Sequence, residues 1–227
     1  MTSKTKDLDL EKLSVREVNA TLQAAEQGAF RVLHPGGEHA LACGLDDPIE
    51  VTVDGHAGYY CAGMNKHASV TVTGNAGTGC AENIMSGSVR VLGDVSQSLA
   101  ATGHGGLVVV EGSASARAGI SMKGVDIVVG GDVGHMSAFM AQAGHLVVLG
   151  DAGTDLGDSI YEAEIYVRGE VSSLGADCEE KPLDEEHRAI LGDLLRRADL
   201  SADASSFKRF GSARRLYHFS IDHMDEY

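Results

Sequence analysis

Cysteine is the first residue type in this 227-residue chain that could carry chemistry, and its spacing argues against most thiol functions. No two cysteines form a Cys-x-x-Cys pair, so zinc ribbons, iron–sulfur clusters and thioredoxin-type redox pairs have no basis in the sequence. Cys61 and Cys80 are separated by one period of a repeat described below, and we interpret them as core thiols of a reduced protein in preference to a disulfide. The four cysteines are Cys43, Cys61, Cys80 and Cys178.

Histidine and carboxylate side chains could gather as metal ligands, but their spacing brings few of them together. Asp126, His145 and Glu164 are the exception, because they are separated by the same period and form a mixed ladder. We interpret this ladder as a solvated surface feature, with a weak metal site as the alternative. Acids at another position of the same period are interpreted as solvated turns, and they are Asp94, Asp132, Asp151 and Glu170.

The period comes from an internal 19-residue repeat of the form apolar-x-Val-x-Gly, which recurs seven times between residues 51 and 169. Its apolar positions alternate with others at the period of a strand, and its glycine permits a left-handed backbone conformation at the turn that follows. We therefore interpret these glycines as structural turn residues and not as phosphate-binding loops, since no Gly-Lys-Ser/Thr follows them. They are Gly55, Gly74, Gly93, Gly112, Gly131, Gly150 and Gly169.

A 19-residue unit with a short strand cannot bury its inner face alone, so it must stack on its neighbours. The sequence therefore predicts an all-β fold, a right-handed single-stranded β-helix (solenoid) of about seven 19-residue coils. Residues 1–30 form an N-terminal segment with a capping helix, which the capping-box pattern from Ser14 to Glu17 begins. Residues 31–175 form the β-helix, and residues 176–227 a C-terminal helix and a docking tail.

The overall composition limits the kinds of partner this chain can have. Eighteen Lys and Arg against 33 Asp and Glu give a net charge of −15, so nucleic acids and anionic membranes are disfavoured partners. No apolar run reaches the length of a membrane span, and the first residues lack the apolar core of a signal peptide. We expect a cytoplasmic protein.

Two surfaces are candidates for docking a partner. Val109, Val128 and Val147 point outward from consecutive coils, and either the helix predicted near residues 184–198 covers this stripe or another subunit does; we favour the helix. The tail after residue 205 is basic and aromatic, and we expect it to dock on an acidic subunit surface, with a nucleic-acid patch as the alternative. Its candidate docking residues are Lys208, Arg209, Arg214, Arg215 and Tyr217.

The glycine columns resemble those of the glutamate synthase C-terminal β-helix domain, a family marked by Gly-x-x-Gly-x-x-x-Gly repeats. Gly150, Gly153 and Gly157 keep all three glycines of that motif. The third glycine is absent after Gly77 and after Gly134, so those turns depart from the family pattern. The resemblance covers roughly residues 30–175 and is strongest to the small, free-standing β-helix subunits of N-methylglutamate synthases, also called methylamine–glutamate N-methyltransferases.

This resemblance implies a noncatalytic scaffold subunit in a flavin-dependent complex that forms N-methylglutamate from glutamate and methylamine. The implied partners are a class II glutamine-amidotransferase-like subunit and an FMN-dependent synthase-like subunit, with FMN on the partner and no cofactor, metal or catalytic residue on this chain. Position 2 is Thr2, where an amidotransferase nucleophile would be cysteine. The alternatives are a β-helix subunit of a split glutamate synthase or of formylmethanofuran dehydrogenase, and an independent β-helix enzyme.

Overall fold

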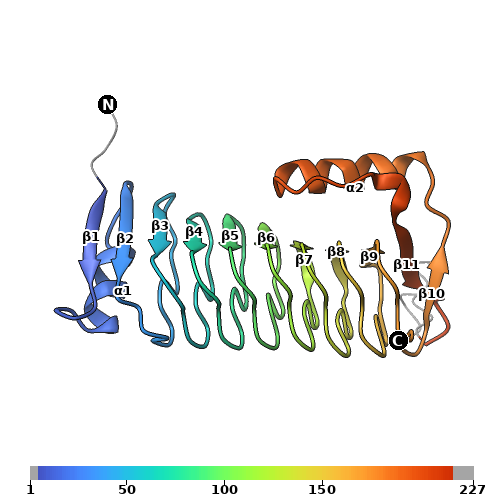
Figure 1. Ribbon diagram of the computed structural model, residues 1–227, viewed down its shortest axis with the longest axis horizontal. Coiled ribbons are helices and arrows are strands. Elements are labelled where there is room, and N and C mark those ends of the chain that lie inside the picture. The colour runs from blue at the N-terminus through green and yellow to red at the C-terminus, as the bar shows by residue number, and fades with distance from the viewer. Residues whose placement is uncertain (1–4, 217–227) are drawn as a thin grey trace, which may run out of the picture.

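The computed structural model describes residues 5–216, and its main body is a stack of coils with one strand in each (Figure 1). In the described chain the strands form one sheet in the order β1-β2-β3-β4-β5-β6-β7-β8-β9-β11-β10. The strands are β1 (Lys6–Asp9), β2 (Ala29–Leu33), β3 (Glu50–Val53), β4 (Ser69–Val72), β5 (Ser88–Val91), β6 (Leu107–Val110), β7 (Lys123–Val129), β8 (Ala143–Val148), β9 (Glu164–Val167), β10 (Cys178–Lys181) and β11 (Lys208–Ser212). The helices are α1 (Val15–Gln23), α2 (Glu185–Arg197) and a short 3-10 turn (Ala204–Ser206).

The parallel strands pair in the register that the repeat predicts. Val51 pairs with Val70, Val70 with Val89, and the same step of one repeat continues through β9. The two inward columns of each strand are fully buried and form the main core of the coils. A second column of small residues pairs from coil to coil outside the strands, beginning with Ala57 and Ala76. The β-solenoid predicted from the sequence is therefore confirmed.

The repeat glycines do follow the strands, but most of them lack the left-handed backbone conformation that we expected. Of the seven, only Gly55 has a left-handed backbone, with φ of +142°. The others are needed because adjacent coils approach too closely for a side chain. A Cβ at Gly112 would lie 2.8 Å from the carbonyl oxygen of Gly93 and would also meet the Asp94 carboxylate. The glycine column therefore exists for close backbone stacking between coils.

The acids after these glycines have a structural task that the sequence interpretation missed. The Asp94 carboxylate accepts a hydrogen bond from the backbone N–H of Ser113, one coil on, at 2.8 Å. The Asp132 carboxylate accepts one from Asp151, whose carboxylate accepts one from Glu170, both at 2.8 Å. They are exposed, as expected of solvated turns, but they also tie each turn to the next coil.

Left-handed residues occur instead on the arc opposite the strands. Tyr60, Ala62 and Met64 have φ values between 55° and 59°, and equivalent positions of later coils repeat this pattern. Their N–H groups point alternately up and down the stack: Tyr60 donates to Thr78, Ala62 to Leu41, and Met64 to Glu82, at 2.8–2.9 Å. Each coil is thus hydrogen-bonded to its neighbours on the arc as well as at the strand.

Both ends of the stack are closed by other elements (Figure 1). At the N-terminal end, the sequence predicted α1 but not β1, which adds a parallel strand to β2. At the C-terminal end, β11 runs antiparallel between β9 and β10 and so stops the parallel stacking. The basic segment that we expected to be a docking tail is therefore, up to Ser212, a strand within the sheet.

Candidate docking surfaces

The outward face of the sheet changes character halfway along the stack. The central outward position of the strands reads Arg31, Thr52, Thr71 and Arg90 on β2–β5, and then Val109, Val128, Val147 and Tyr166 on β6–β9. α2 lies along the stacking direction over the apolar half (Figure 1). Its Leu191, Leu194 and Leu195 form a second core with the valines, which are at most 2% exposed.

The sequence allowed either α2 or another subunit to cover the valine stripe. In the structure α2 covers it, as we favoured. Val109, Val128 and Val147 are therefore not available to a partner subunit while α2 is in place, and their assignment as docking residues was wrong. The physical reason is that the apolar face of α2 and the stripe each remove the other from water.

A polar network fixes α2 on the sheet along the predicted acid–histidine ladder. Asp126 contacts His145 Nδ1 at 2.8 Å and Arg197 of α2 at 2.8 Å. Burial raises the pKa of Asp126, but the hydrogen bonds from His145 and Arg197 outweigh it and leave the pKa below the ordinary value of 3.8. This end of the ladder is therefore a helix clamp.

Glu164, at the other end of the ladder, is also held by contacts within the chain. Glu164 accepts hydrogen bonds from the Tyr166 hydroxyl and from Arg209 Nη1, the latter at 2.8 Å, and lies 3.1 Å from His187 Nε2 of α2. Burial and then the neighbouring Glu164 carboxylate raise the pKa of Tyr166 well above its usual value. Within residues 5–216 these three side chains do not converge on the spacing of a metal site. The interpretation as a solvated ladder also needs correction, because the three side chains are only 17–28% exposed and Asp126 and Glu164 bond to α2.

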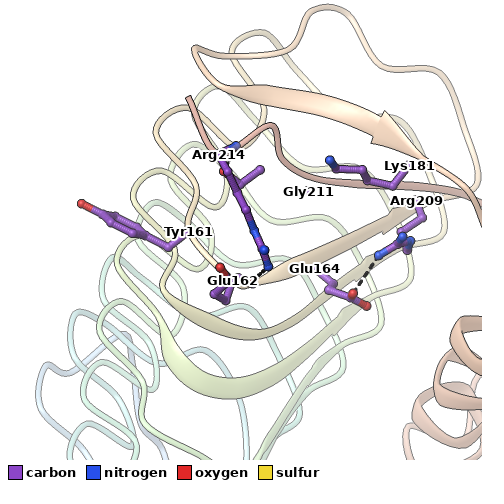
Figure 2. A pocket seen from close by; sticks show the side chains of 9 residues that line it. Tyr161, Glu162, Glu164, Lys181, Arg209, Gly211 and Arg214 are labelled. Carbon is purple, nitrogen blue, oxygen red and sulfur yellow. Dashed lines mark hydrogen bonds and ion pairs between the residues drawn. The ribbon is translucent and has the colours of Figure 1, made fainter. Parts of the chain in front are cut away.

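A cavity of about 330 Å³ lies at the C-terminal seam, where the chain before β9 meets β10 and β11 (Figure 2). Three cations line it, and each has a carboxylate within 2.8 Å. Arg209 contacts Glu164, Arg214 contacts Glu162, and Lys181 contacts Glu179. Because these charges are already neutralised, the cavity is a polar seam that anchors β11 and offers no free cation of this set to an anionic ligand.

The predicted docking residues of the basic segment therefore divide into anchored and exposed ones. Arg209 is 14% exposed and donates through Nε to the carbonyl of Pro182 at 2.9 Å, so it belongs to the fold. Lys208, Arg214 and Arg215 are exposed; Arg214 also pairs with Glu162 at 2.7 Å, and Arg215 lies 3.6 Å from Glu179. Tyr217 lies outside the described residues, as does Thr2. Docking by the exposed cations stays a prediction.

The described residues contain one group that meets the spacing of a metal site, Asp9 with Glu11 and His34. Asp9 already bonds to Lys12 at 2.7 Å and to His34 at 2.9 Å, and these hydrogen bonds hold the pKa of Asp9 well below its usual range. Glu11 and His34 are exposed. The group is an ion-paired surface cluster, which is common without a metal.

The thiols do not have the properties of nucleophiles. All four cysteines are free, and Cys61 and Cys80 are fully buried in the coil core. Burial raises the pKa of Cys80 to about 12 and that of Cys61 well above its usual value. The interpretation of this pair as core thiols is confirmed.

One exposed surface was missed by the sequence interpretation. Tyr59, Tyr60, Met64 and Met85, here called the tyrosine–methionine patch, are between 47% and 56% exposed. Tyr59, Tyr60 and Met64 lie on or beside the left-handed arc of one coil, and Met85 follows the arc of the next coil. The sequence did contain a signal for this surface. The residues one and two repeats after Tyr60 and Met64 are small or polar, so these two large apolar residues depart from their columns.

Comparison with known proteins places the chain in a family. No protein-family model matches the sequence, and no solved structure matches it. The chain is 56% identical over 225 residues to Protein GlxC of Rhizobium meliloti (strain 1021), covering 97% of this chain and 99% of the relative. The chain belongs to the GlxC family. Because nearly all of both chains align, the similarity to GlxC extends beyond the coils into both flanking segments.

Some of the described surfaces of this GlxC-family member are covered by the chain itself, and others are accessible to a partner. The stripe under α2 and the C-terminal seam are closed by contacts within the chain. The polar sheet face of β3–β5 and the tyrosine–methionine patch remain open. Neither described helix is long and apolar enough to cross a membrane.

Proposed function

We propose that this chain is the noncatalytic scaffold subunit of a flavin-dependent, glutamate-synthase-like complex that forms N-methylglutamate from glutamate and methylamine. In this proposal it holds a class II glutamine-amidotransferase-like subunit against an FMN-binding synthase-like subunit in the cytoplasm. The chain itself binds no cofactor or metal and supplies no catalytic residue.

The observation that carries the proposal is the glycine-column solenoid. The glycine repeats resemble those of the glutamate synthase β-helix domain, and they lie where adjacent coils are in backbone contact. The full-length similarity to GlxC supports the view that the coils, α2 and the terminal strands belong together as one arrangement. The substrate in this proposal follows from the resemblance to the β-helix subunits of N-methylglutamate synthases.

The architecture suits a spacer between two larger proteins. Strand, turn and arc of each coil are all hydrogen-bonded to the adjacent coils, so each coil is fixed to its neighbours around its circumference. Seven coils at about 4.8 Å each span roughly 34 Å, enough to separate two docking positions on one side. Since both ends are closed by other elements, partners would dock on the sides of the stack.

The test is to purify the chain from its own cells under gentle conditions and to record native mass spectra with a flavin absorbance scan. We expect two larger subunits and bound FMN to elute with the chain. A colourless chain without partners would contradict the proposal and favour an independent β-helix enzyme. A flavin complex that aminates with ammonia and not methylamine would favour a split glutamate synthase.

A further inference from the structure

The tyrosine–methionine patch is built as a rigid surface. The aromatic ring of Tyr60 lies over Gly79 of the next coil, where an added Cβ would come within 2.6 Å of the ring. The Tyr59 ring lies over Gly77 in the same way, at 2.9 Å. From the preceding coil, His39 stacks on Tyr59 with ring centroids 4.5 Å apart. Glycines of one coil thus make room for half-exposed rings of another.

Met64 lines the same small cavity as the Tyr60 ring, and Met85 lies on the next coil. The N–H of Met64 bonds to the carbonyl of Glu82, and the N–H of Met85 bonds to the carbonyl of Asn65, so both residues lie at the junction of the same two coils. Their side chains are 56% and 47% exposed. Half-exposed tyrosines and methionines gathered in one place are typical of the centre of a protein interface.

Stacking of the coils does not require this patch. The positions equivalent to Tyr60 in successive coils are Gly79, Ser98, Arg117, Met136 and Asp155, and those equivalent to Met64 are Asn83, Thr102, Ser121, Met140 and Ser159. Both columns are predominantly small or polar, and the solenoid continues through them unchanged. Within residues 5–216, large apolar residues return to these two columns only at Met136 and Met140, and the exposed tyrosine rings are confined to the coil that begins at β3.

A small cavity beside the patch carries negative charge. It has a volume of about 170 Å³ and is lined by Cys43, Tyr60, Gly63, Met64, Glu82 and Asn83. The Glu82 carboxylate forms no ion pair or hydrogen bond with another side chain of residues 5–216. The electrostatic complement is a positively charged side chain.

We propose that the tyrosine–methionine patch docks a partner protein that places a lysine or arginine in the cavity at Glu82 and surrounds it with apolar side chains. This inference deepens the proposed scaffold function and rests on it, because it requires that a partner subunit exists. Rings and thioethers supply the desolvated centre of the contact, and the Glu82 carboxylate, once shielded from water, supplies the charge pair.

Methionine oxidation in the intact complex tests whether the patch is covered. Met140 is the internal control, because it occupies the same coil position as Met64, with a similar left-handed φ, and is 38% exposed. In the free chain Met64 and Met85 would oxidise at least as fast as Met140, since they are more exposed. We expect both to oxidise about tenfold more slowly than Met140 in the complex purified from its own cells. Oxidation as fast as that of Met140 would overturn the inference.

Charge reversal tests the chemistry of the partner. Glu82→Arg is expected to lower the fraction of chain recovered in the complex about tenfold, and raised salt to lessen the difference from the native chain. Glu50→Arg is the matched control, because Glu50 is an exposed acid of the preceding coil and lies on the sheet face. Equal loss with both variants, or with neither, would overturn the inference. The inference would also be overturned by a dimer of this chain that dissociates in Glu82→Arg and not in Glu50→Arg, because the patch would then bind a second copy of the chain.

These measurements separate the inference from the proposed function. A complex that contains FMN and forms N-methylglutamate while Met64 and Met85 stay freely oxidisable keeps the function and rejects the docking surface. A basic protein bound at the patch in a complex without flavin would keep the docking surface and reject the proposed function.

Discussion

Arg90 of β5 donates a hydrogen bond from Nη2 to the carbonyl oxygen of Ala198, the C-cap of α2, at 2.6 Å. A cation thus meets the negative end of the helix dipole at the point where the outward column changes from polar to apolar. The bond joins residues 108 positions apart and marks the limit of the surface that α2 covers.

Removing this guanidinium should loosen α2 at its C-terminal end. Arg90→Ala is expected to destabilise the docked helix by about 1 kcal/mol, because a charged hydrogen bond to a partly exposed carbonyl is lost. Amide hydrogen exchange in α2 measures the effect. Arg31→Ala is the control, since Arg31 has the same outward register on β2 but pairs with Asp54 and does not contact α2. Equal exchange in the two variants would refute the role of Arg90.

Neighbouring valines should report separately on the two cores. Val129→Asp puts a carboxylate inside the coils and should unfold the chain, because an unpaired buried charge costs at least about 2 kcal/mol. Val128→Asp puts the same group under α2 and should release the helix while the coils remain. Circular dichroism and limited proteolysis distinguish these results. Coils lost in both variants would mean that α2 is essential to the solenoid.

Two glycines should respond in opposite directions to the same substitution. Gly112→Ala is expected to destabilise the chain by roughly 1–3 kcal/mol, because the new Cβ would push on the adjacent coil. Gly192→Ala in α2 should stabilise it by about 0.5–1 kcal/mol, since nothing lies within 4 Å of the added atom. Urea unfolding of both variants gives the comparison. A neutral Gly112→Ala would reject close coil stacking as the reason for the glycine column.

Acid should weaken the clamp on α2. The pKa of Asp126 is lowered from 3.8 in the folded chain, so its stabilising effect is complete above that pH and is lost as the pH falls through the folded value. Helix release, followed by hydrogen exchange or by circular dichroism, is expected to become easier below about pH 4. In Asp126→Asn this part of the pH dependence should disappear. An unchanged acid profile in that variant would contradict the clamp.

Much of the fold could be predicted because stacked coils repeat their side chains at a fixed interval. The columns that begin at Val51 and Val53 specified the strand positions and the register, and the leucines of α2 indicated a cover for Val128. The left-handed arcs could not be predicted, because Ala62 and Met64 have ordinary side chains and adopt that conformation only within the stack. The long-range partners of Asp126 and Glu164 depend on how α2 lies on the sheet, which no periodicity encodes.

The terminal strands were missed for a related reason. β11 is basic and contains Gly211, so its composition is typical of an exposed segment, yet it pairs on both sides. Contacts of Arg209 with Glu164 and Pro182 compensate for its unfavourable strand composition. Short strands of this kind are specified by tertiary contacts and not by local pattern.

The most direct test of the scaffold account is the rate of N-methylglutamate formation with and without this chain. The two larger subunits would be purified from cells that lack it, mixed with glutamate and methylamine, and assayed before and after the chain is added back. We predict that coupled formation of N-methylglutamate is absent without the chain and returns on addition, while flavin content is unchanged. Full activity of the two larger subunits alone would contradict the account.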